Sequence, residues 1–228
     1  MNVHQQYARV KRKLDSYKMI YPKCTMAGDN ILIDSVKFLA KNCTSITETG
    51  TYLGWTTMFF AQEFPGKHIY TSEVSEEYYN KAKEYLINCK NVKMFLEPSQ
   101  KVIPKLIYTK SLGDNPFFFL DAHCQEFWPL EEELKIICRN LDRAIILIHD
   151  FKVPHKWRFG YDAWSGKECS FKLVNEAFTK PYKYILPTHS HKDAFKNNEP
   201  HHDLRGYIFM FYNNDVIYIN FKNGFKLR

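Results

Sequence analysis

The sequence lacks long apolar runs, paired cysteines and an export signal, and each absence excludes a class of protein. No segment approaches the roughly 20 apolar residues that a helix needs to cross a bilayer, so we expect no membrane partner. The basic N-terminus has neither the apolar core nor the small-residue cleavage site of a secretory signal, which predicts a cytoplasmic protein. The six cysteines include no C-x-x-C pair and fit neither a zinc ribbon nor a disulfide framework. We therefore expect reduced, mostly buried thiols.

Composition and charge are those of an ordinary globular protein. The 228 residues, 45% of them hydrophobic, suit one large α/β domain, and a charged content of 25% argues against disorder. We expect residues 1–228 to form a single domain with an N-terminal helical arm over about residues 1–42. The net charge of +7 is spread along the chain, so it indicates a solvated surface rather than a face that binds nucleic acid.

Strand-like and helix-like segments alternate through most of the chain. The runs "PFFFLDAH" (116–123) and "RAIILIHD" (143–150) predict buried strands, and "PLEEELKIICRN" (129–140) between them predicts a helix with an acidic first turn. An earlier helix is predicted over residues 30–42, with Asn30 as its cap. Such alternation predicts a parallel sheet with helices on both faces. The other predicted strands are 44–48, 67–73 and 92–97, and the other predicted helices are 55–64, 75–89 and 99–107.

The C-terminal part breaks this alternation. The segments "GYIFMFY" (206–212) and "VIYINF" (216–221) flank the turn-forming "NND", which predicts a β-hairpin. The predicted fold class is therefore α/β, with a doubly wound, Rossmann-like, mostly parallel seven-stranded sheet that ends in an antiparallel hairpin. Two long irregular stretches remain, at about residues 151–167 and about residues 188–205.

The stretch "ITETGTYLGWTT" (46–57) contains two of the chain's 9 glycines, Gly50 and Gly54, just after the first predicted strand. In a doubly wound sheet the ligand lies at the carboxyl ends of the strands, and this turn must let the ligand approach the backbone closely. Glu48 can accept hydrogen bonds there, and the helix N-terminus at Trp55 favours a carboxylate or phosphate. A tight packing loop would also use glycines, but Glu73 ends the next strand where such folds bind ribose hydroxyls. We expect a nucleoside ligand.

Five segments carry a recognisable set of motifs: "ETGTYLGWTT", "TSEVSEEYY", "EPSQKVIPKL", "FFFLDAH" and "IILIHDFKVP". In this order and spacing they resemble the class I S-adenosylmethionine methyltransferases, most of all the divalent-metal-dependent O-methyltransferases of the catechol and caffeoyl-CoA type. The resemblance covers about residues 46–154. It places the methionine end of the cofactor at Glu48, Gly50 and Tyr52, the ribose at Glu73, the adenine at Ser99 and Gln100, and Asp121 beside the cofactor, and Gly54 is the second cofactor-binding glycine of the turn.

Asp121 and Asp150 end neighbouring predicted strands, so both point into the crevice where members of this family hold Mg²⁺ or a similar cation. The likeness is incomplete, because Phe151 replaces the family's third ligand, an asparagine, and "LDAHCQE" lacks the family's lysine base. Strand alternation places Asp121 and His123 on one side, whereas it makes His149 and Asp150 diverge. A site of Asp121, His123 and Asp150 suits Mg²⁺ or Mn²⁺, and Fe²⁺ or Zn²⁺ as readily.

The same residues also fit a site without metal. Asp121 would then orient the acceptor, His123 would act as a general base, and His149 would be either catalytic or a core histidine held by the backbone. The catalytic candidates are therefore Asp121, His123 and His149, and whether a metal is bound stays open.

Two further segments bear on the acceptor. The aromatic stretch "FKVPHKWRFGYDAWSGKECS" (151–170) follows the fifth strand and is interpreted as a wall or lid of the acceptor site rather than a packed loop. The late histidines would serve as a transition-metal site or stay solvated, and we favour solvated side chains. They are His189, His191, His201 and His202.

The leading hypothesis is an enzyme that moves the methyl group of S-adenosylmethionine to an oxygen of a small hydroxyl-bearing acceptor, such as a sugar, a polyketide or a phenol. Two alternatives stay open: a methyltransferase-like domain that binds the cofactor without turnover, and an NAD(P)-dependent oxidoreductase. A nucleic-acid partner is not expected, since no N-P-P-Y-type segment is present. The N-terminal arm would serve as a homodimer contact, as a cover for the acceptor, or as neither.

Overall fold

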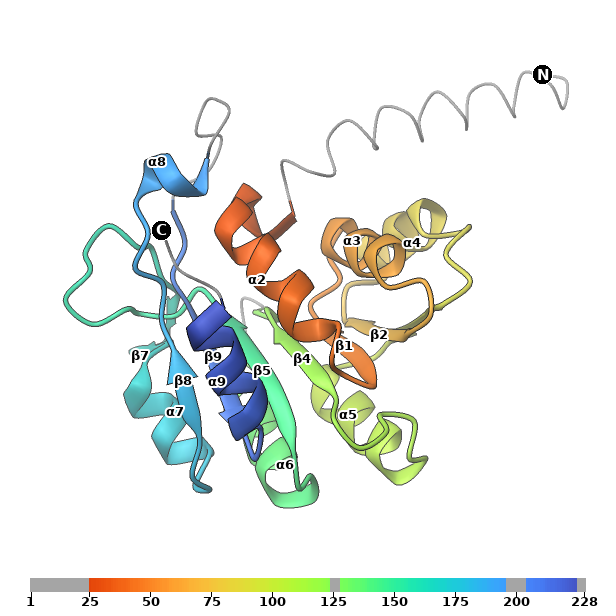
Figure 1. The fold of residues 1–228 in the computed structure, drawn as a ribbon. Helices are drawn as coiled ribbons and strands as arrows, with labels where there is room; N and C mark the ends of the chain where they lie inside the picture. The colour runs from red at the N-terminus through yellow and green to blue at the C-terminus, as the bar shows by residue number, and fades with distance from the viewer. Residues whose placement is uncertain (1–24, 124–127, 196–203, 225–228) are drawn as a thin grey trace, which may run out of the picture.

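The computed structural model describes residues 25–123, 128–195 and 204–224 (Figure 1). Most of the predicted N-terminal arm lies outside these residues, as do Cys24, Cys124, His201 and His202. The helices are η1 (Thr25–Gly28), α2 (Asn30–Ala40), α3 (Trp55–Glu63), α4 (Glu76–Tyr85), α5 (Ser99–Tyr108), α6 (Leu130–Asn140), α7 (Phe171–Ala177), α8 (His191–Ala194) and α9 (Asp215–Gly224). The strands are β1 (Ser45–Thr49), β2 (His68–Glu73), β3 (Val92–Leu96), β4 (Phe117–Leu120), β5 (Ala144–His149), β6 (Ala163–Trp164), β7 (Lys167–Glu168), β8 (Lys183–Ile185) and β9 (Tyr207–Tyr212).

Seven of the strands form one sheet in the order β3-β2-β1-β4-β5-β9-β8. The strands β1 to β5 pair in parallel, whereas β9 runs antiparallel to both β5 and β8. The strand order reverses between β1 and β4, which is the kind of point where doubly wound folds bind ligands. The predicted fold class is confirmed, including the antiparallel end of the sheet.

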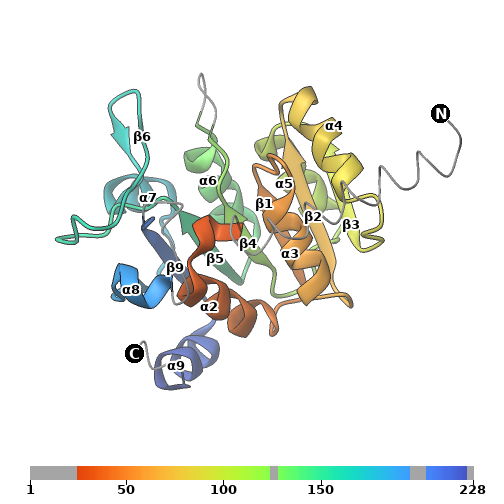
Figure 2. The same cartoon turned by 90° about the horizontal axis from the view of Figure 1, so that it is seen from above.

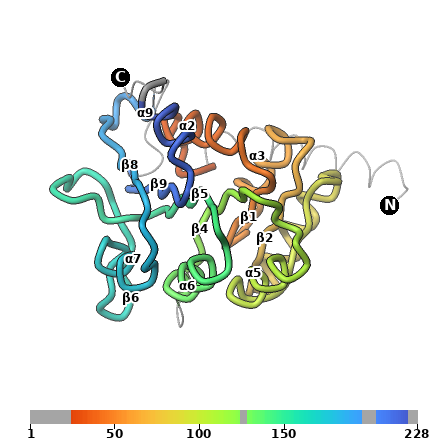
Figure 3. Tube along the Cα trace, turned by 60° about the horizontal axis from the view of Figure 1, so that its bottom comes forward, coloured from red at the N-terminus to blue at the C-terminus, as the bar shows by residue number. Residues whose placement is uncertain are grey.

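The sheet is buried on both faces because its central strands carry large apolar residues at consecutive positions. In β4, Phe117 and Phe119 pack in the cluster that includes α2, α3 and α9, while Phe118 and Leu120 pack in the cluster that includes α5, α6 and α7. Figure 3 shows these two groups of helices on opposite sides of the strands. Both layers hold the strand ends of the sheet in fixed positions.

The predicted C-terminal hairpin is wrong in its second strand. The segment "VIYINF" belongs to helix α9, and the antiparallel partner of β9 is β8, which comes before it in the chain. Ile217, Tyr218 and Phe221 pack on the core while Val216 and Ile219 are exposed, so the apolar residues follow a helical spacing. Strand β8 and helix α7 were not predicted, because both are short.

Two expectations near the start of α2 also need correction. The N-cap of α2 is Asp29 rather than Asn30, and Asp29 Oδ1 accepts hydrogen bonds from the backbone of Ile31 and Leu32. The other carboxylate oxygen of Asp29 lies 2.8 Å from Nε2 of His189, a buried residue that we expected to be solvated. A buried carboxylate needs a partner, so this pair joins α2 to the segment before α8. His191 is exposed, as expected.

Two predicted properties of the whole chain are tested by the described residues. The four cysteines that they include, Cys43, Cys89, Cys138 and Cys169, are free thiols, and all but Cys89 are buried. Among the described helices, none combines the length and the apolar character of a membrane-spanning segment.

The turn between β9 and α9 depends on the side chain of Asn214. The amide nitrogen of this buried residue donates to Asn115 Oδ1 and to the backbone oxygens of Ala144 and Tyr212, at 2.9, 3.0 and 3.1 Å. We expect Asn214→Ala to lower the free energy of unfolding by about 1 to 3 kcal/mol, because three buried acceptors lose a donor. Urea denaturation followed by circular dichroism measures the change.

Asn140→Ala is the matched control for this experiment. The Asn140 side chain is exposed and donates to a carbonyl of its own helix, that of Ile136, so its loss should change stability by less than about 0.5 kcal/mol. Equal effects of the two substitutions would contradict the anchoring role of Asn214.

Candidate cofactor and acceptor cleft

A cleft of about 870 Å³ opens at the carboxyl ends of the parallel strands. Its walls come from the turns after β1, β2, β3 and β4, the first turns of α4 and α5, and the segment that leads into β6. Six of the eight predicted cofactor residues line it: Gly50, Tyr52, Glu73, Ser99, Gln100 and Asp121. Glu48 and Gly54 do not line the cleft.

The end of β1 approaches the end of β4 so closely that Gly50 leaves no room for a side chain. Gly50 has φ +83°, and a Cβ atom on it would lie 2.9 Å from the backbone oxygen of Asp121. Both the left-handed conformation and the contact exclude other residues at this position. Gly54 has φ +80° as the cap of α3, and a Cβ there would meet side chains of α4.

Glu73 is held in place by backbone N–H groups at the end of β2. Its Oε1 accepts hydrogen bonds from the amides of Val74 and Ser75, both at 2.9 Å, and its Oε2 accepts one from the amide of Tyr52 at 2.8 Å. The carboxylate therefore cannot rotate freely, although its residue borders the cleft. Tyr52 sits in the left-handed region at φ +48°, and its exposed ring packs on Tyr78 at 4.6 Å between ring centroids.

Ser99 and Gln100 open α5 and border the cleft beside Glu97 and Pro98. The N-cap of this helix is Pro98, whose side chain makes no capping hydrogen bond. The first amides of α5 therefore remain available at the cleft. This part of the cleft therefore offers a ligand hydrogen-bonding groups from both the backbone and the side chains.

Glu48 lies inside the core and not on the cleft. It is 1% exposed and accepts hydrogen bonds from the hydroxyls of Thr57 and Thr71. Burial raises the pKa of Glu48 to about 8, and the two hydroxyls only moderate this effect. Glu48 therefore links the end of β1 to α3 and β2 through hydrogen bonds inside the core. Its contact with the cofactor stays a prediction.

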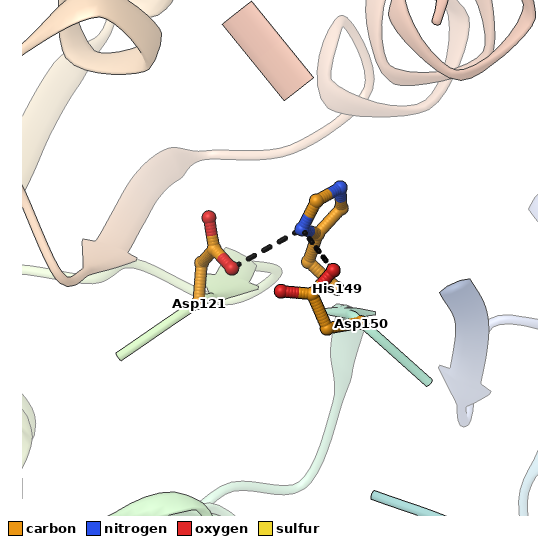
Figure 4. Close-up of side chains that lie close together, drawn as sticks. All are labelled: Asp121, His149 and Asp150. Atoms are coloured by element: carbon orange, nitrogen blue, oxygen red, sulfur yellow. Dashed lines mark hydrogen bonds and ion pairs between the residues drawn. The ribbon is translucent and has the colours of Figure 1, made fainter. Parts of the chain in front are cut away.

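Three predicted residues meet where β4 and β5 end (Figure 4). Nδ1 of His149 lies 3.2 Å from Oδ1 of Asp121 and 3.3 Å from Oδ1 of Asp150. Burial opposes the charged form of the imidazole, but the carboxylates of Asp150 and Asp121 outweigh it and raise the pKa of His149 well above its usual range. The two carboxylates therefore favour the protonated form of His149.

The expected divergence of His149 and Asp150 is wrong. Strand β5 ends at His149, and Asp150 adopts the left-handed region at φ +56°, so the alternation of strand side chains stops there. In β4 the strand likewise ends before Asp121, so Asp121 and His123 are not fixed on one side. The donor atoms that come together are those of Asp121, His149 and Asp150 in one group, and those of His123, Asp150 and Asp162 in another.

Arg205 is the partner of Asp150 that the sequence did not reveal. Its Nε donates to Asp150 Oδ1 and its Nη2 donates to Asp162 Oδ1. The other oxygen of Asp162 lies 3.5 Å from Nε2 of His123. Burial opposes ionisation of Asp150, but His149 and Arg205 lower its pKa below the usual range. One chain of charged groups thus runs from Asp121 through Arg205 to His123.

These residues do not fit an Mg²⁺ centre. Mg²⁺ needs several free oxygen ligands, whereas the guanidinium of Arg205 engages both Asp150 and Asp162. Nδ1 of His149, the imidazole nitrogen that would ligate a metal, instead lies between the carboxylates of Asp121 and Asp150. The family's asparagine position is Phe151, which is fully buried in the core. The chain itself supplies the positive charges that a metal would bring.

Glu133 is a second feature that sequence reasoning missed. It lies in the first turn of α6 and is fully buried, and neither of its carboxylate oxygens has a hydrogen-bond partner among the described residues. Burial raises the pKa of Glu133 to about 7, and the nearby hydroxyls of Ser99 and Thr49 lower it only in part. The helical spacing of the sequence could have revealed this position, because Glu133 falls on the buried face of α6 together with Leu130 and Leu134.

A small cavity of about 10 Å³ lies behind the cleft, in front of Glu133 and His149. It shares five lining residues with the cleft, so it forms the inner end of the same space. These shared residues are Asp121, Ala122, His123, Trp128 and Asp162. A volume of this size is close to what one water molecule occupies.

Aromatic side chains form the outer wall beside Asp162. Trp164 in β6, which belongs to the predicted acceptor wall, borders the cleft, as does Trp128 before α6, which lies outside that stretch, whereas Trp157 is 97% exposed and does not. The β6–β7 hairpin turns through Ser165 and Gly166, which both have positive φ. Figure 2 shows this hairpin projecting from the sheet on the side of α6 and α7.

The hairpin segment is tied to the rest of the molecule by its backbone. The amide of Asp162 donates to the oxygen of Asp150 at 2.9 Å, and the amide of Gly160 donates to the oxygen of Leu204 at 2.8 Å. Arg205 adds its ion pairs to the same junction. The wall of the cleft is therefore fixed to β5 and to the residues before β9.

Comparison with known proteins identifies the fold. The chain matches no family model and no curated protein. Among solved structures, a SAM-dependent methyltransferase from Aquifex aeolicus matches with a TM-score of 0.53 at 19% identity, covering 90% of this chain and 96% of that one.

Two further structures match at similar levels. The O-methyltransferase TomG from Streptomyces achromogenes, in complex with SAM, has a TM-score of 0.54 at 14% identity, covering 80% of this chain and 78% of that one. An O-methyltransferase structure from Klebsiella pneumoniae has a TM-score of 0.50 at 18% identity and covers 79% of this chain and 80% of that one. The chain thus has the class I methyltransferase fold, as the sequence motifs predicted.

The buried carboxyl of Glu48 makes stability depend on pH. The folded protein keeps a proton on Glu48 up to a pKa of about 8, whereas the unfolded chain releases it near the ordinary value of 4.5. The free energy of unfolding should therefore fall as pH rises between these values. Glu48→Gln lacks this proton, so the wild type should lose at least about 1 kcal/mol more than the variant across the range.

Urea denaturation at several pH values measures the slope of the unfolding free energy against pH for the wild type and for Glu48→Gln. Glu76→Gln, an exposed glutamate on α4, is the matched control and should keep the wild-type slope. If Glu48→Gln also keeps that slope, the carboxyl of Glu48 is ionised in the folded protein and the argument fails.

Proposed function

We propose that the chain is an S-adenosylmethionine-dependent methyltransferase that methylates an oxygen of a small hydroxyl-bearing acceptor. The observation that carries this proposal is the cleft at the reversal of strand order, where the backbone-held carboxylate of Glu73 borders the same space as Ser99 and Gln100. The methyltransferase fold agrees with it. An oxidoreductase would not need these groups together with Asp121.

The residues of the cleft divide into a cofactor end and an acceptor end. Glu73 would bind the ribose hydroxyls, and Ser99 with Gln100 would bind the adenine, because these groups offer acceptors and donors at the ends of β2 and β3. Gly50 would let the methionine part pass close to the backbone. The part of the cleft beyond Asp121 is then left for the acceptor.

S-adenosylmethionine supplies a methyl group on a positively charged sulfur. The acceptor oxygen attacks this carbon while the carbon–sulfur bond breaks, and the oxygen gives up its proton. His123 is the proposed base, because its imidazole borders the acceptor end and pairs with Asp162, which would stabilise the imidazolium. Asp121, fixed by His149, would orient the acceptor. Most of the rate would come from positioning.

Titration with S-adenosylhomocysteine tests the cofactor assignment. We expect binding to the wild type, and we expect Glu73→Gln to weaken it at least tenfold, because a carboxylate that accepts from hydroxyls is lost. Isothermal titration calorimetry measures both affinities. Glu77→Gln is the matched control, since Glu77 is exposed on α4 and pairs with Lys81. Failure of the wild type to bind S-adenosylhomocysteine would refute the proposed function.

The role of Arg205 predicts how the site responds to metal ions. The wild type should bind Mn²⁺ weakly or not at all, and EDTA should leave its affinity for S-adenosylhomocysteine unchanged. Arg205→Ala should gain affinity for Mn²⁺, because Asp150 and Asp162 lose the guanidinium that neutralises them. The electron paramagnetic resonance signal of free Mn²⁺ measures this binding.

Arg143→Ala serves as the control for Arg205→Ala. Arg143 is exposed and donates to the backbone of Asn213, away from the cleft, so its loss should leave Mn²⁺ binding as in the wild type. Tight Mn²⁺ binding by the wild type that Asp121→Asn abolishes would instead establish a metal centre.

A further inference from the structure

The charge of the cleft is opposite to the charge of the chain. The chain has 32 Lys and Arg residues and a net charge of +7. Among the described residues that line the cleft there is no lysine or arginine, whereas four are carboxylates: Glu73, Glu97, Asp121 and Asp162. An arrangement of this kind attracts cations and repels phosphates and carboxylates.

The two pairs of carboxylates serve different ends of the cleft. At the cofactor end, Glu73 is held by backbone amides and Glu97 is paired with Lys105. At the acceptor end, the side chains of Asp121 and Asp162 are 26% and 29% exposed. Of their partners, Arg205 borders neither the cleft nor the inner cavity, and His149 borders only the inner cavity. The main cleft therefore presents the carboxylates of Asp121 and Asp162 to the acceptor.

The inner cavity adds a further acid to this end. Glu133 is fully buried and borders the cavity; the hydroxyls of Ser99 and Thr49 lie near its carboxyl, but neither oxygen has a partner of good hydrogen-bond geometry within the described segments. A buried polar group without a partner is costly, so such a group at the closed end of a ligand cleft indicates a missing donor. A water molecule or an N–H group of a ligand would supply that donor.

Aromatic rings complete the acceptor end. Trp128 and Trp164 border the cleft together with Asp162 and Ala163. Tryptophan is the best aromatic partner for an ammonium group, and carboxylates next to tryptophan are a common means of binding amines in water. The same rings would give an anionic acceptor no compensation for the repulsion by Asp121 and Asp162.

We propose that the acceptor is a cation: a small hydroxylated molecule with an amine or quaternary ammonium group, whose charge lies between Asp121, Asp162 and the two indole rings. This inference rests on the proposed function, which assigns this end of the cleft to the acceptor. It excludes acceptors that carry phosphate, sulfate or a coenzyme A thioester. The methyl group moves to the hydroxyl, and the ammonium group only positions it.

Choline and its neutral isostere 3,3-dimethylbutan-1-ol provide the test, since a quaternary carbon in the alcohol replaces the positively charged nitrogen of choline. Both are titrated into the protein saturated with S-adenosylhomocysteine, whose sulfur is neutral, so the cofactor's own charge plays no part. We expect choline to bind at least about tenfold more tightly than the alcohol. Saturation-transfer NMR measures both dissociation constants.

Two pairs of variants, each a substitution in the cleft with its control, show which residues cause the preference for choline. Asp162→Asn should reduce the preference for choline, and Asp114→Asn, at an exposed position just before β4 and outside the cleft lining, should not. Trp164→Ala should weaken choline binding, whereas Trp157→Ala at a fully exposed position should leave it unchanged. These pairs separate a loss of recognition from a loss of folding.

The outcomes are distinct. If S-adenosylhomocysteine does not bind, the proposed function itself fails. If it binds but choline shows no advantage over the alcohol, or does not bind, the carboxylates serve only the cofactor's sulfonium and the inference is overturned. A preference for choline that Asp162→Asn leaves intact also overturns it.

Discussion

The close approach of the ends of β1 and β4 is the constraint on which the rest of the site depends. Gly50 permits it, because no other residue tolerates both the backbone angle and the contact with the backbone of Asp121. This contact sets the width of the cleft between Glu73 on one side and Asp121 on the other. Glu48 supports the turn from the core, so a buried acid helps to fix the backbone on which the ligand would lie.

The second determinant of the site is a set of ion pairs at the position where the resembling enzymes hold a metal ion. Where the resembling enzymes use a divalent cation, this protein has Arg205 and the imidazole of His149 against Asp121, Asp150 and Asp162. An arginine has a fixed geometry and cannot be removed by a chelator, and it also joins the wall of the cleft to β5. In the proposed mechanism a base of the protein itself, His123, takes the acceptor's proton.

Sequence patterns predicted most of the sheet and the cofactor end, because alternation of strands and helices and the glycine turn are local signals. The prediction failed where the backbone leaves a regular element. The left-handed angle of Asp150 brings His149 and Asp150 together, and no periodicity reveals such an angle. Arg205 is separated from Asp150 by 55 positions, so only the folded chain shows that they meet. Glu133 was within reach, since it interrupts an otherwise apolar helix face.

The junction of residues 150, 162 and 205 has a consequence for biosynthesis. Chains emerge from the ribosome with the N-terminus first, and the segments that form the cofactor end all precede residue 124. The acceptor wall is fixed only when the residues just before β9 arrive and pair with Gly160 and Asp162. The segments that border the proposed cofactor end are therefore synthesised before the residues that complete the acceptor wall.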